Sequence, residues 1–266
     1  MSRPVLNLLR VSRLPIFTQL HLEEALLRAT TDNWLIINDG AFHPAIVIGI
    51  SGRPQELVHC EEALQHGIQA IRRFTGGGTV VVDQDTVFST LIMQGSSLPQ
   101  VDCFPHPIMA WTEKLYRPAF AAAGCPDFTL RENDYVVGSG LKVGGNAQAI
   151  TGRRWLHHTS FLWDYQREHM ALLRQPAKAP KYRQGRQHGE FVTRLCDVLS
   201  PHRGRQALVQ SIAASAAELG FELQERSLAE AAPALQHRPL LLGSKLLDLR
   251  SFAASAVEPN SNSSGR

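Results

Sequence analysis

The stretch Arg72-Arg73-Phe74-Thr75-Gly76-Gly77-Gly78-Thr79-Val80-Val81-Val82-Asp83 places three consecutive glycines between an apolar run and a β-branched run. Each glycine loses more backbone entropy on ordering than any other residue, so three in a row suit neither a helix nor a strand. They suit a sharp turn whose backbone approaches a ligand closely. The two arginines add forked donors for a carboxylate or phosphate. The glycines alone leave another interpretation open, a glycine-rich hairpin with ordinary surface arginines.

A second informative stretch is Gly138-Ser139-Gly140-Leu141-Lys142-Val143-Gly144-Gly145, in which a lysine follows a glycine turn. Small residues on both sides of Lys142 leave room for a ligand. A lone ammonium in a concave site of low dielectric can hold an acyl carbonyl and a phosphate together. The alternative is a solvated surface lysine, which is the usual environment of this residue type.

The third stretch carries paired histidines, His157 and His158, in a predicted strand over residues 155–162. Neighbouring residues of a strand point to opposite faces, so at most one of the two faces a site. For His157 the favoured interpretation is a hydrogen-bonded histidine inside the sheet. For His158 a structural and a functional interpretation both stay open.

Composition restricts the class of protein. The chain has 266 residues, 44% of them hydrophobic and 19% charged, which is typical of a soluble globular protein. A net charge of +3 is too small to indicate nucleic-acid binding, and no apolar run reaches the roughly 18–20 residues that span a bilayer. The four cysteines form no CxxC pair, so we expect a reducing compartment, no structural zinc and no protein-bound metal site.

The N-terminal sequence does not decide between two cellular compartments. Arg3, Arg10 and Arg13 precede the first acidic residue, Glu23, which would suit a mitochondrial transit peptide. The segment is poor in serine, however, and residues 5–11 have the pattern of a strand. We therefore favour folded structure and a cytoplasmic protein, with a mitochondrial location as the alternative.

Periodicity predicts more strands than helices, in runs that do not alternate strictly with helices. This pattern indicates an α+β fold with a mixed, mostly antiparallel sheet flanked by helices. We expect one domain over residues 1–256, a polar disordered tail over 257–266 and no separate C-terminal accessory domain. The predicted helices cover residues 15–27, 54–65, 108–123, 188–198 and 205–219. The predicted strands cover residues 5–11, 34–38, 45–49, 68–73, 79–82, 86–92, 128–131, 135–137, 142–150, 155–162, 221–224 and 240–247.

Two finer expectations belong to this scheme. The strands at 79–82 and 86–92 are predicted to form a hairpin, and Glu23 and Glu24 are placed on the outer face of the first helix. The triple glycine opens a strand, whereas a Rossmann fingerprint would open a helix. A Walker loop would need Gly-Lys-Ser/Thr, which the stretch lacks.

Taken in order, the three stretches resemble the lipoate–protein ligase A family, a branch of the biotin/lipoate ligase catalytic-domain superfamily. The matching patterns are Arg-Arg-x-Thr-Gly-Gly-Gly-x-Val…Asp, then Asn-Asp…Gly-x-Lys-Val-x-Gly-x-Ala-Gln, then His-His-x-x-x-Leu. The similarity extends upstream through residues 38–49 and covers about residues 5–225. Three linked motifs in order are far more specific than any one of them.

The resemblance implies an enzyme that makes an acyl-adenylate from lipoate (or octanoate) and ATP with Mg²⁺. The acyl group then passes to one lysine of a lipoyl carrier domain, in the E2 subunit of a 2-oxoacid dehydrogenase or in the glycine cleavage H protein. Lys142 corresponds to the family's single catalytic lysine, which is proposed to hold the acyl carbonyl and the α-phosphate. The resemblance assigns the acyl and ATP sites to Arg73, Gly76, Gly77, Gly78, Thr79, Val80, Val81, Asp83, Asn133, Lys142 and His158.

Departures from the family pattern matter. The family's His-Asp after the glycine turn is Val82-Asp83 here, and its Ser-Gly-Ser is Gly144-Gly145-Asn146. Many ligases carry a small C-terminal domain, for which too little chain remains after about residue 225. Either the catalytic domain acts alone, or a separate accessory subunit supplies what is missing.

Two other functions remain open. An octanoyltransferase of the same superfamily passes an acyl group from an acyl carrier protein through a cysteine thioester. Cys125, seventeen residues before Lys142, would be its nucleophile, although a small core residue is the favoured interpretation. The third possibility is a non-catalytic subunit that binds an acyl group or a carrier domain.

A basic loop lies beside the predicted site. Lys178, Lys181, Arg183 and Arg186 fall within nine residues. We expect this loop to order over the adenylate or to meet the acidic surface of the carrier domain; the alternative is a solvated loop.

Overall fold

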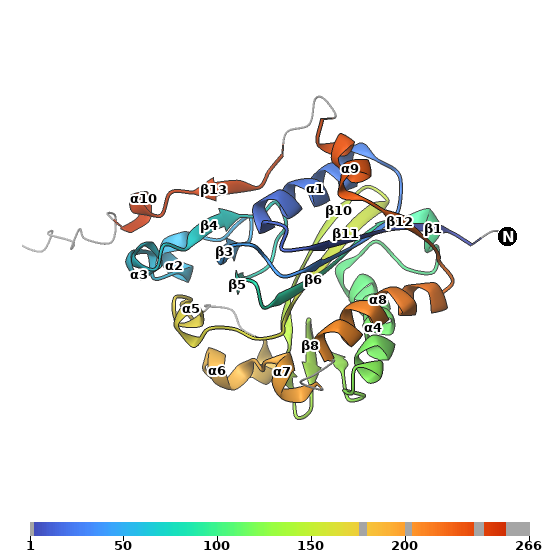
Figure 1. The fold of residues 1–266 in the computed structure, drawn as a ribbon. Helices are drawn as coiled ribbons and strands as arrows, with labels where there is room; N and C mark the ends of the chain where they lie inside the picture. The colour runs from blue at the N-terminus through green and yellow to red at the C-terminus, as the bar shows by residue number, and fades with distance from the viewer. Residues whose placement is uncertain (1–2, 176–179, 200–203, 237–241, 254–266) are drawn as a thin grey trace, which may run out of the picture.

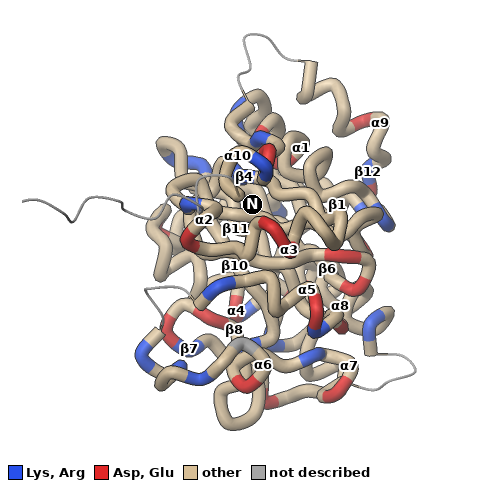
Figure 2. The backbone as a smooth tube through the Cα atoms, turned by 90° about the vertical axis from the view of Figure 1, so that its left-hand side faces the viewer, with Lys and Arg blue, Asp and Glu red and all other residues tan. Residues whose placement is uncertain are grey.

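The computed structural model describes residues 3–175, 180–199, 204–236 and 242–253 (Figure 1). The predicted disordered tail, the strand residues before 242 and Lys178 of the basic loop lie outside these ranges, wholly or in part. Within them, no helix is both long and apolar enough to cross a membrane. Basic and acidic positions are interspersed along the backbone on the side that Figure 2 shows.

A six-stranded mixed sheet forms the centre of the molecule, in the strand order β10-β11-β6-β2-β1-β12. Strand β1 pairs in parallel with β2 and β12, and the other pairs in this sheet are antiparallel. The N-terminal strand prediction is confirmed, because β1 lies inside this sheet. The strand bounds are β1 Val5–Ser12, β2 Trp34–Asp39, β6 Thr86–Gln94, β10 Gly144–Thr151, β11 Arg154–Leu162 and β12 Glu222–Arg226.

Two smaller sheets complete the strand pairing. One has the order β13-β4-β3-β5, and the other, β7-β8-β9, is wholly antiparallel. The mixed, mostly antiparallel α+β fold is therefore as predicted. The bounds are β3 Ala45–Ile48, β4 Gln69–Arg72, β5 Thr79–Val82, β7 Thr129–Arg131, β8 Asp134–Val137, β9 Leu141–Lys142 and β13 Lys245–Leu247.

Helices cover both faces of the large sheet. In Figure 1, α1 and α9 lie on one face, and α4 and α8 on the other. The α-helix bounds are α1 Ile16–Ala29, α2 Pro54–Leu57, α3 Cys60–Gln65, α4 Pro105–Ala122, α5 Arg167–Ala171, α6 His188–Phe191, α7 Leu195–Val198, α8 Gly204–Glu218, α9 Leu228–Ala231 and α10 Arg250–Ala253. The 3₁₀ segments are η1 Gly95–Ser97, η2 Lys181–Arg183 and η3 Ala232–Gln236.

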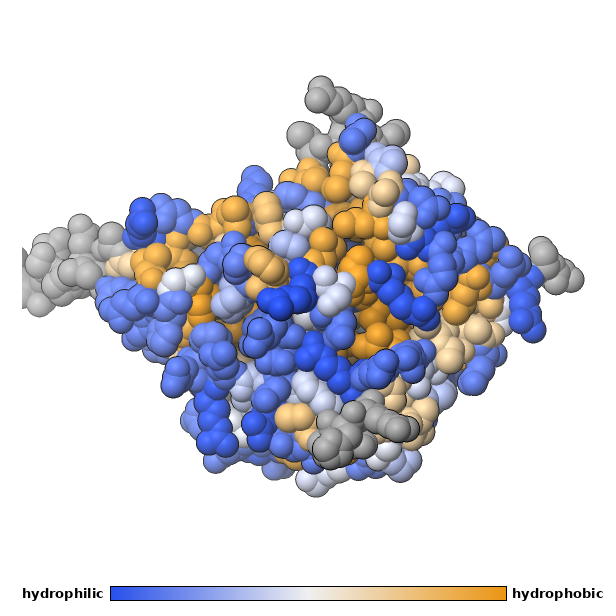
Figure 3. Space-filling view, in the orientation of Figure 1, coloured by the Kyte–Doolittle hydropathy of each residue, from blue (hydrophilic) through white to orange (hydrophobic). Residues whose placement is uncertain are grey.

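The packing places α1 against both the large and the small sheet. A buried apolar cluster joins Ile16 and Leu20 of α1 to Val47, Val82 and Phe88 on β3, β5 and β6. The larger core lies under the other sheet face, where Trp111, Tyr116 and Phe120 of α4 are buried. In the space-filling view, hydrophobic residues gather in the upper and central part of the face (Figure 3). The helix α1 is thus fixed beside the small sheet that carries the glycine turn.

The predicted hairpin between residues 79–82 and 86–92 is wrong. Strand β5 pairs with β3 in the small sheet, whereas β6 pairs with β2 and β11 in the large one. The turn between them carries the chain from one sheet to the other. Both strands are apolar and β-branched, so their local pattern specifies burial and leaves the pairing partner unspecified.

The helix predicted over residues 54–65 is divided in two. Val58 is extended (φ −137°) and forms a bridge with Leu173, which separates α2 from α3. Helix α4 begins three residues earlier than predicted, because Pro105 and Pro107 occupy its first turn, where a missing N–H costs little.

The segment predicted as a helix over residues 188–198 is interrupted beside the candidate lysine. Val192 forms a parallel bridge with Lys142, and the Thr193 N–H donates to the Lys142 carbonyl at 2.9 Å. This pairing separates α6 from α7. Lys142 itself ends the two-residue strand β9, and the long strand expected from residue 142 begins at Gly144, after the pairing partner has changed from β8 to β11.

Candidate functional site

The glycine turn is held by the buried guanidinium of Arg73, which is 3% exposed. Its Nε and Nη2 donate to the Gly76 carbonyl at 3.2 and 2.7 Å, Nη2 also donates to Gly78 at 2.9 Å, and Nη1 donates to Val47 at 3.2 Å. Burial lowers the pKa of Arg73 to about 10, so it is charged at neutral pH. Arg73 therefore shapes the turn from inside and brings positive charge to it.

Close backbone packing explains two of the glycines. A Cβ at Gly49 would lie 2.2 Å from the Gly77 carbonyl oxygen, and Gly77 has a φ of +96° that favours glycine. By contrast, a Cβ at Gly76 or Gly78 would meet no atom within 4 Å. Those two positions face open space, as expected if a ligand approaches the turn there.

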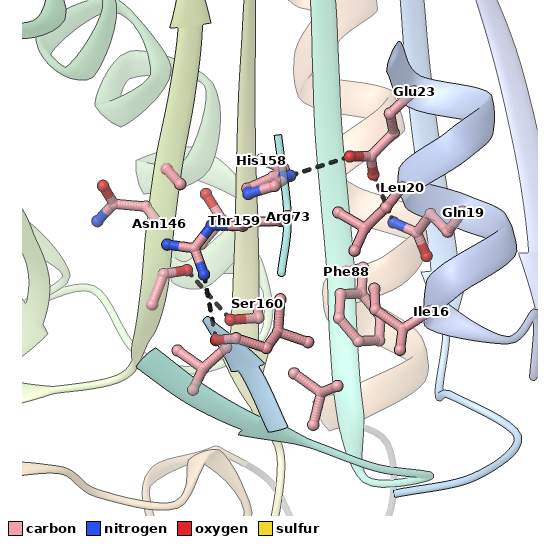
Figure 4. A pocket seen from close by; sticks show the side chains of 15 residues that line it. Ile16, Gln19, Leu20, Glu23, Arg73, Phe88, Asn146, His158, Thr159 and Ser160 are labelled. Carbon is pink, nitrogen blue, oxygen red and sulfur yellow. Dashed lines mark hydrogen bonds and ion pairs between the residues drawn. The ribbon is translucent and has the colours of Figure 1, made fainter. Parts of the chain in front are cut away.

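A first cavity lies between α1 and the sheets (Figure 4). About half of its lining residues are aliphatic or aromatic, and the contact between Glu23 and His158 marks what we call its polar end. Side chains of α1 project toward the strands that carry Phe88 and His158. Its lining residues are Ile16, Gln19, Leu20, Glu23, Val47, Arg73, Val80, Val82, Phe88, Gly145, Asn146, Ala147, His158, Thr159 and Ser160.

His158 belongs to the polar end of this cavity. Its Nδ1 lies 2.9 Å from Glu23 Oε2, and its Nε2 lies 3.4 Å from Thr75 Oγ1. The carboxylate of Glu23 is fully buried and also accepts from Gln19 and Thr90, both at 2.7 Å. The structure thus places His158 on the cavity side of the sheet.

Glu23 and Glu24 are not on the outer face of α1, which corrects the prediction. Both side chains are fully buried. Residues 16, 20, 23 and 27 follow helical i, i+4, i+7 spacing, so the periodicity does place position 23 on the buried stripe. The prediction followed the charge of the residue instead of its position, and it missed a residue of the cavity.

A second cavity contains the candidate lysine. It meets the first cavity at Val80 and Gly145, which line both. Lys142 lies in its wall with a side chain that is 23% exposed. The lining residues are Leu57, Gly78, Thr79, Val80, Val81, Lys142, Gly144, Gly145, Leu162, Met170, Leu173, Arg174, Pro180, Arg183, Phe191 and Val192.

Lys142 is oriented by a carboxylate. Its Nζ lies 2.6 Å from Asp134 Oδ1, and the Tyr182 hydroxyl donates to Asp134 Oδ2 at 2.8 Å. The Nζ is also 6.0 Å from the ring centroid of Phe191, within reach of a cation–π contact. These partners hold the ammonium in the cavity wall. No sequence motif indicated Tyr182 or Phe191.

The remaining predicted residues fall around the cavities. Asn133 is exposed, and its carbonyl accepts from Asn146 Nδ2 at 2.9 Å, so it supports a lining residue through its backbone. Asp83 lies in the turn after β5, where its carboxylate accepts from the Asp85 N–H at 2.9 Å, and burial raises its pKa. Neither residue lines the two cavities described here.

The basic loop is packed against the protein in its described part. Arg183 is 4% exposed and lines the second cavity together with Pro180. Arg186 donates to the carbonyls of Tyr182 and Arg183 at 2.9 and 3.1 Å. Lys181 is exposed. The described loop is therefore ordered beside the cavity, with one lysine facing solvent.

Cys125 lies in the hydrophobic core and is 4% exposed. Its Sγ donates to Asp127 Oδ1 at 3.0 Å, and burial together with this carboxylate raises the pKa of the thiol to about 12. It lines neither of the two cavities. Among the described residues, no group of three or more His, Cys, Asp or Glu side chains is placed to hold a metal ion.

His157 points to the opposite side of the sheet from His158 and is fully buried. Its Nδ1 lies 3.1 Å from Gln148 Nε2, and its Nε2 lies 3.1 Å from both the Tyr135 hydroxyl and Thr159 Oγ1. Burial lowers its pKa to about 3, with His158 contributing. His157 is therefore a neutral structural histidine in a buried hydrogen-bond network.

This depressed pKa predicts acid sensitivity. Unfolded histidine takes up a proton below about pH 6.5, whereas folded His157 does so only near pH 3. Between pH 7 and 5 the free energy of unfolding should fall by about 2 kcal/mol from this residue alone. In urea unfolding at both pH values, His157→Gln should remove most of that difference, and exposed His43→Gln should leave it intact. An unchanged pH dependence in His157→Gln would contradict the assignment.

The molecule thus combines mixed sheets with two neighbouring cavities that share Val80 and Gly145, and the second of them contains Lys142. The sequence matches the Lipoyl protein ligase A/B catalytic domain over residues 15–217. The chain therefore belongs to this family, as the three motifs predicted.

Similar proteins agree with the family. "Inactive lipoate--protein ligase 2" of Plasmodium falciparum (isolate 3D7) is 25% identical, over 78% of this chain and 69% of that protein. A bi-partite lipoate protein ligase from Thermoplasma acidophilum, described with its E2 lipoyl domain, matches with a TM-score of 0.69 at 20% identity, over 88% of this chain and 91% of that chain. A lipoate-protein ligase A bound with ATP gives 0.68 at 18% identity, over 88% of this chain and 92% of that chain. These structures share the fold.

Proposed function

We propose that this protein activates lipoate with ATP and Mg²⁺ and transfers the acyl group to a lysine of a lipoyl carrier domain. The observation that supports this most is the junction of the two cavities at Val80 and Gly145. An acyl tail in the first cavity would bring its carboxylate toward this junction. The second cavity, with Lys142 and Arg183 in its wall, has the positive charge to accept a nucleotide.

Several of the predicted residues have a role in this proposal. Val80 and Val81 offer backbone to the nucleotide, and the glycine turn lets phosphate approach without Cβ atoms in the way. Lys142 stabilises negative charge on the acyl carbonyl and the α-phosphate as the adenylate forms. Mg²⁺ fits here as a companion of the phosphates, because this ion is usually bound through phosphate oxygens and one or two carboxylates.

The carrier is proposed to be the lipoyl domain of an E2 subunit or an H protein. The Thermoplasma relative is described with an E2 lipoyl domain and is bi-partite, which supports a lipoyl-domain partner and makes a separate accessory subunit worth testing here. We further propose that residues 1–256 act as one catalytic unit. Exposed Lys181, at the edge of the second cavity, is the described loop residue placed to meet an acidic carrier surface.

A second candidate is a subunit that binds lipoate without turning it over. The name of the Plasmodium relative, an inactive ligase, favours this alternative. Lipoate-dependent exchange of pyrophosphate into ATP separates the two. Exchange that needs both lipoate and Mg²⁺ supports adenylate formation. Tight lipoate binding without exchange would contradict the ligase function and favour a non-catalytic subunit.

The cysteine-thioester route predicts an essential thiol. We expect Cys125→Ala to keep acyl transfer within about twofold of wild type, since a buried thiol with a raised pKa is a poor nucleophile. Cys103→Ala, at a partly buried position, is the matched control. A loss of more than about 100-fold that is specific to Cys125→Ala would instead favour an octanoyltransferase that uses a covalent intermediate.

A further inference from the structure

A segment beyond the family-matched region crosses α1 and reaches the glycine turn. This strap, residues 242–247, ends in β13, which adds an antiparallel edge strand to β4 (Figure 1). It lies outside residues 15–217. The family assignment therefore does not explain the role of this segment.

One residue of the strap is bound to α1. The Gly243 N–H donates to Glu24 Oε2 at 2.8 Å, and the carboxylate of Glu24 is fully buried and also paired with Arg28. The approach is close, since a Cβ at Gly243 would lie 3.2 Å from Phe74 Cβ and 3.3 Å from Glu24 Oε1. The strap backbone thus packs tightly between the helix and the turn.

The next residue is bound to the glycine turn. Ser244 is 3% exposed, and its Oγ accepts from the Phe74 N–H at 3.1 Å. The Ser244 carbonyl also lies 3.0 Å from His21 Nε2 on α1. Ser244 therefore satisfies a buried backbone donor within the turn and contacts the helix at the same time.

The two walls that the strap joins both contact His158. Glu23, next to Glu24, lies 2.9 Å from His158 Nδ1. Thr75, next to Phe74, lies 3.4 Å from His158 Nε2. Each tie is thus one residue away from a group that contacts this histidine. The tie to the turn binds the Phe74 backbone, and the tie to α1 binds the Glu24 carboxylate.

We propose that Gly243 and Ser244 are positioning residues of the acyl cavity, which fix Glu23 and Thr75 on either side of His158. This inference rests on the proposed binding of lipoate in that cavity. On this proposal, recognition of the acyl substrate depends on a part of the chain that lies beyond the family-matched residues 15–217. Removing one tie should therefore loosen the polar end of the acyl cavity more than the nucleotide cavity, which the turn lines at Gly78.

The test is calorimetric binding of lipoate and of ATP–Mg²⁺ to full-length variants, below their melting temperatures. Ser244→Ala should weaken lipoate binding about three- to tenfold, the effect of one lost hydrogen bond, and change ATP binding by less than about twofold. Glu24→Gln, which weakens the other tie with little change in size, should shift lipoate binding in the same direction. Leu246→Thr, at a 55% exposed position of β13, is the control and should bind like wild type.

A double-mutant cycle separates positioning from general destabilisation. If the strap acts through His158, Ser244→Ala should have little further effect on lipoate binding in a His158→Ala background. Equal weakening of lipoate and ATP binding, or a lower melting temperature with unchanged lipoate affinity, would overturn the positioning role. Wild-type protein that binds no lipoate would overturn the proposed function and this inference together. Normal binding by wild type and both variants would overturn the inference alone.

Discussion

Lys142→Ala should lower the rate of lipoate-dependent adenylate formation by about 10²–10³-fold, the usual cost of removing one group that stabilises developing charge. The expected loss is in kcat, because lipoate binds in the other cavity and the ammonium acts mainly as the phosphorus–oxygen bond is exchanged. Lys142→Arg should also be poor, since a planar guanidinium does not reproduce a point charge.

The matched control is Lys114→Ala, an exposed lysine on α4 that lies outside both cavities. It should retain wild-type kinetics. Because Lys142→Ala leaves Asp134 with one partner fewer, the thermal stability of the variant must be measured beside its activity. A folded Lys142→Ala protein with near-normal pyrophosphate exchange would remove this lysine from the mechanism.

Gly49→Ala should destabilise the free protein by about 3 kcal/mol or more, at the upper end of overpacking effects. The new Cβ would lie 2.2 Å from the Gly77 carbonyl oxygen, and Arg73 holds that turn by donating three hydrogen bonds to the Gly76 and Gly78 carbonyls. The backbone on both sides has little freedom to move. We therefore expect weaker binding of lipoate and ATP as well as lower stability.

Gly76→Ala is the control for stability, because its Cβ would meet no atom within 4 Å in the same turn. It should change the free energy of unfolding by less than about 1 kcal/mol. Urea unfolding of both variants measures the difference. Equal stability of the two variants would show that the turn can shift, and that close packing of Gly49 against it is not a constraint.

Local sequence patterns predicted most of the elements and the position of the glycine turn. Residues 5–11 are mostly apolar and pack as an inner strand in which residues 6–9 are all buried, and Pro15 marks the start of α1. Pairing was less predictable. Strands β5 and β6 have similar compositions, so their separation into two sheets depends on contacts with β3, β2 and β11 that no local pattern encodes.

Site residues that belong to a sequence motif could be predicted. Their contact partners from distant segments of the chain could not. Lys142 and His158 lie in cavity walls. Glu23 contacts His158 from 135 positions away, Phe191 lies beside Lys142, and Tyr182 binds the Asp134 that pairs with Lys142. Charge misled the prediction at Glu23 and Glu24, since a carboxylate is buried when hydrogen-bond donors surround it. The break between α6 and α7 likewise depends on the bridge from Val192 to Lys142.

The most direct measurement is transfer of lipoate to an apo lipoyl domain, with and without ATP–Mg²⁺, while AMP release and the mass of the carrier are followed. We predict a carrier that gains one lipoyl group on lysine and releases one AMP for each transfer, only when ATP is present. Transfer from an octanoyl acyl carrier protein without ATP, or lipoate binding with no transfer under any condition, would contradict the account.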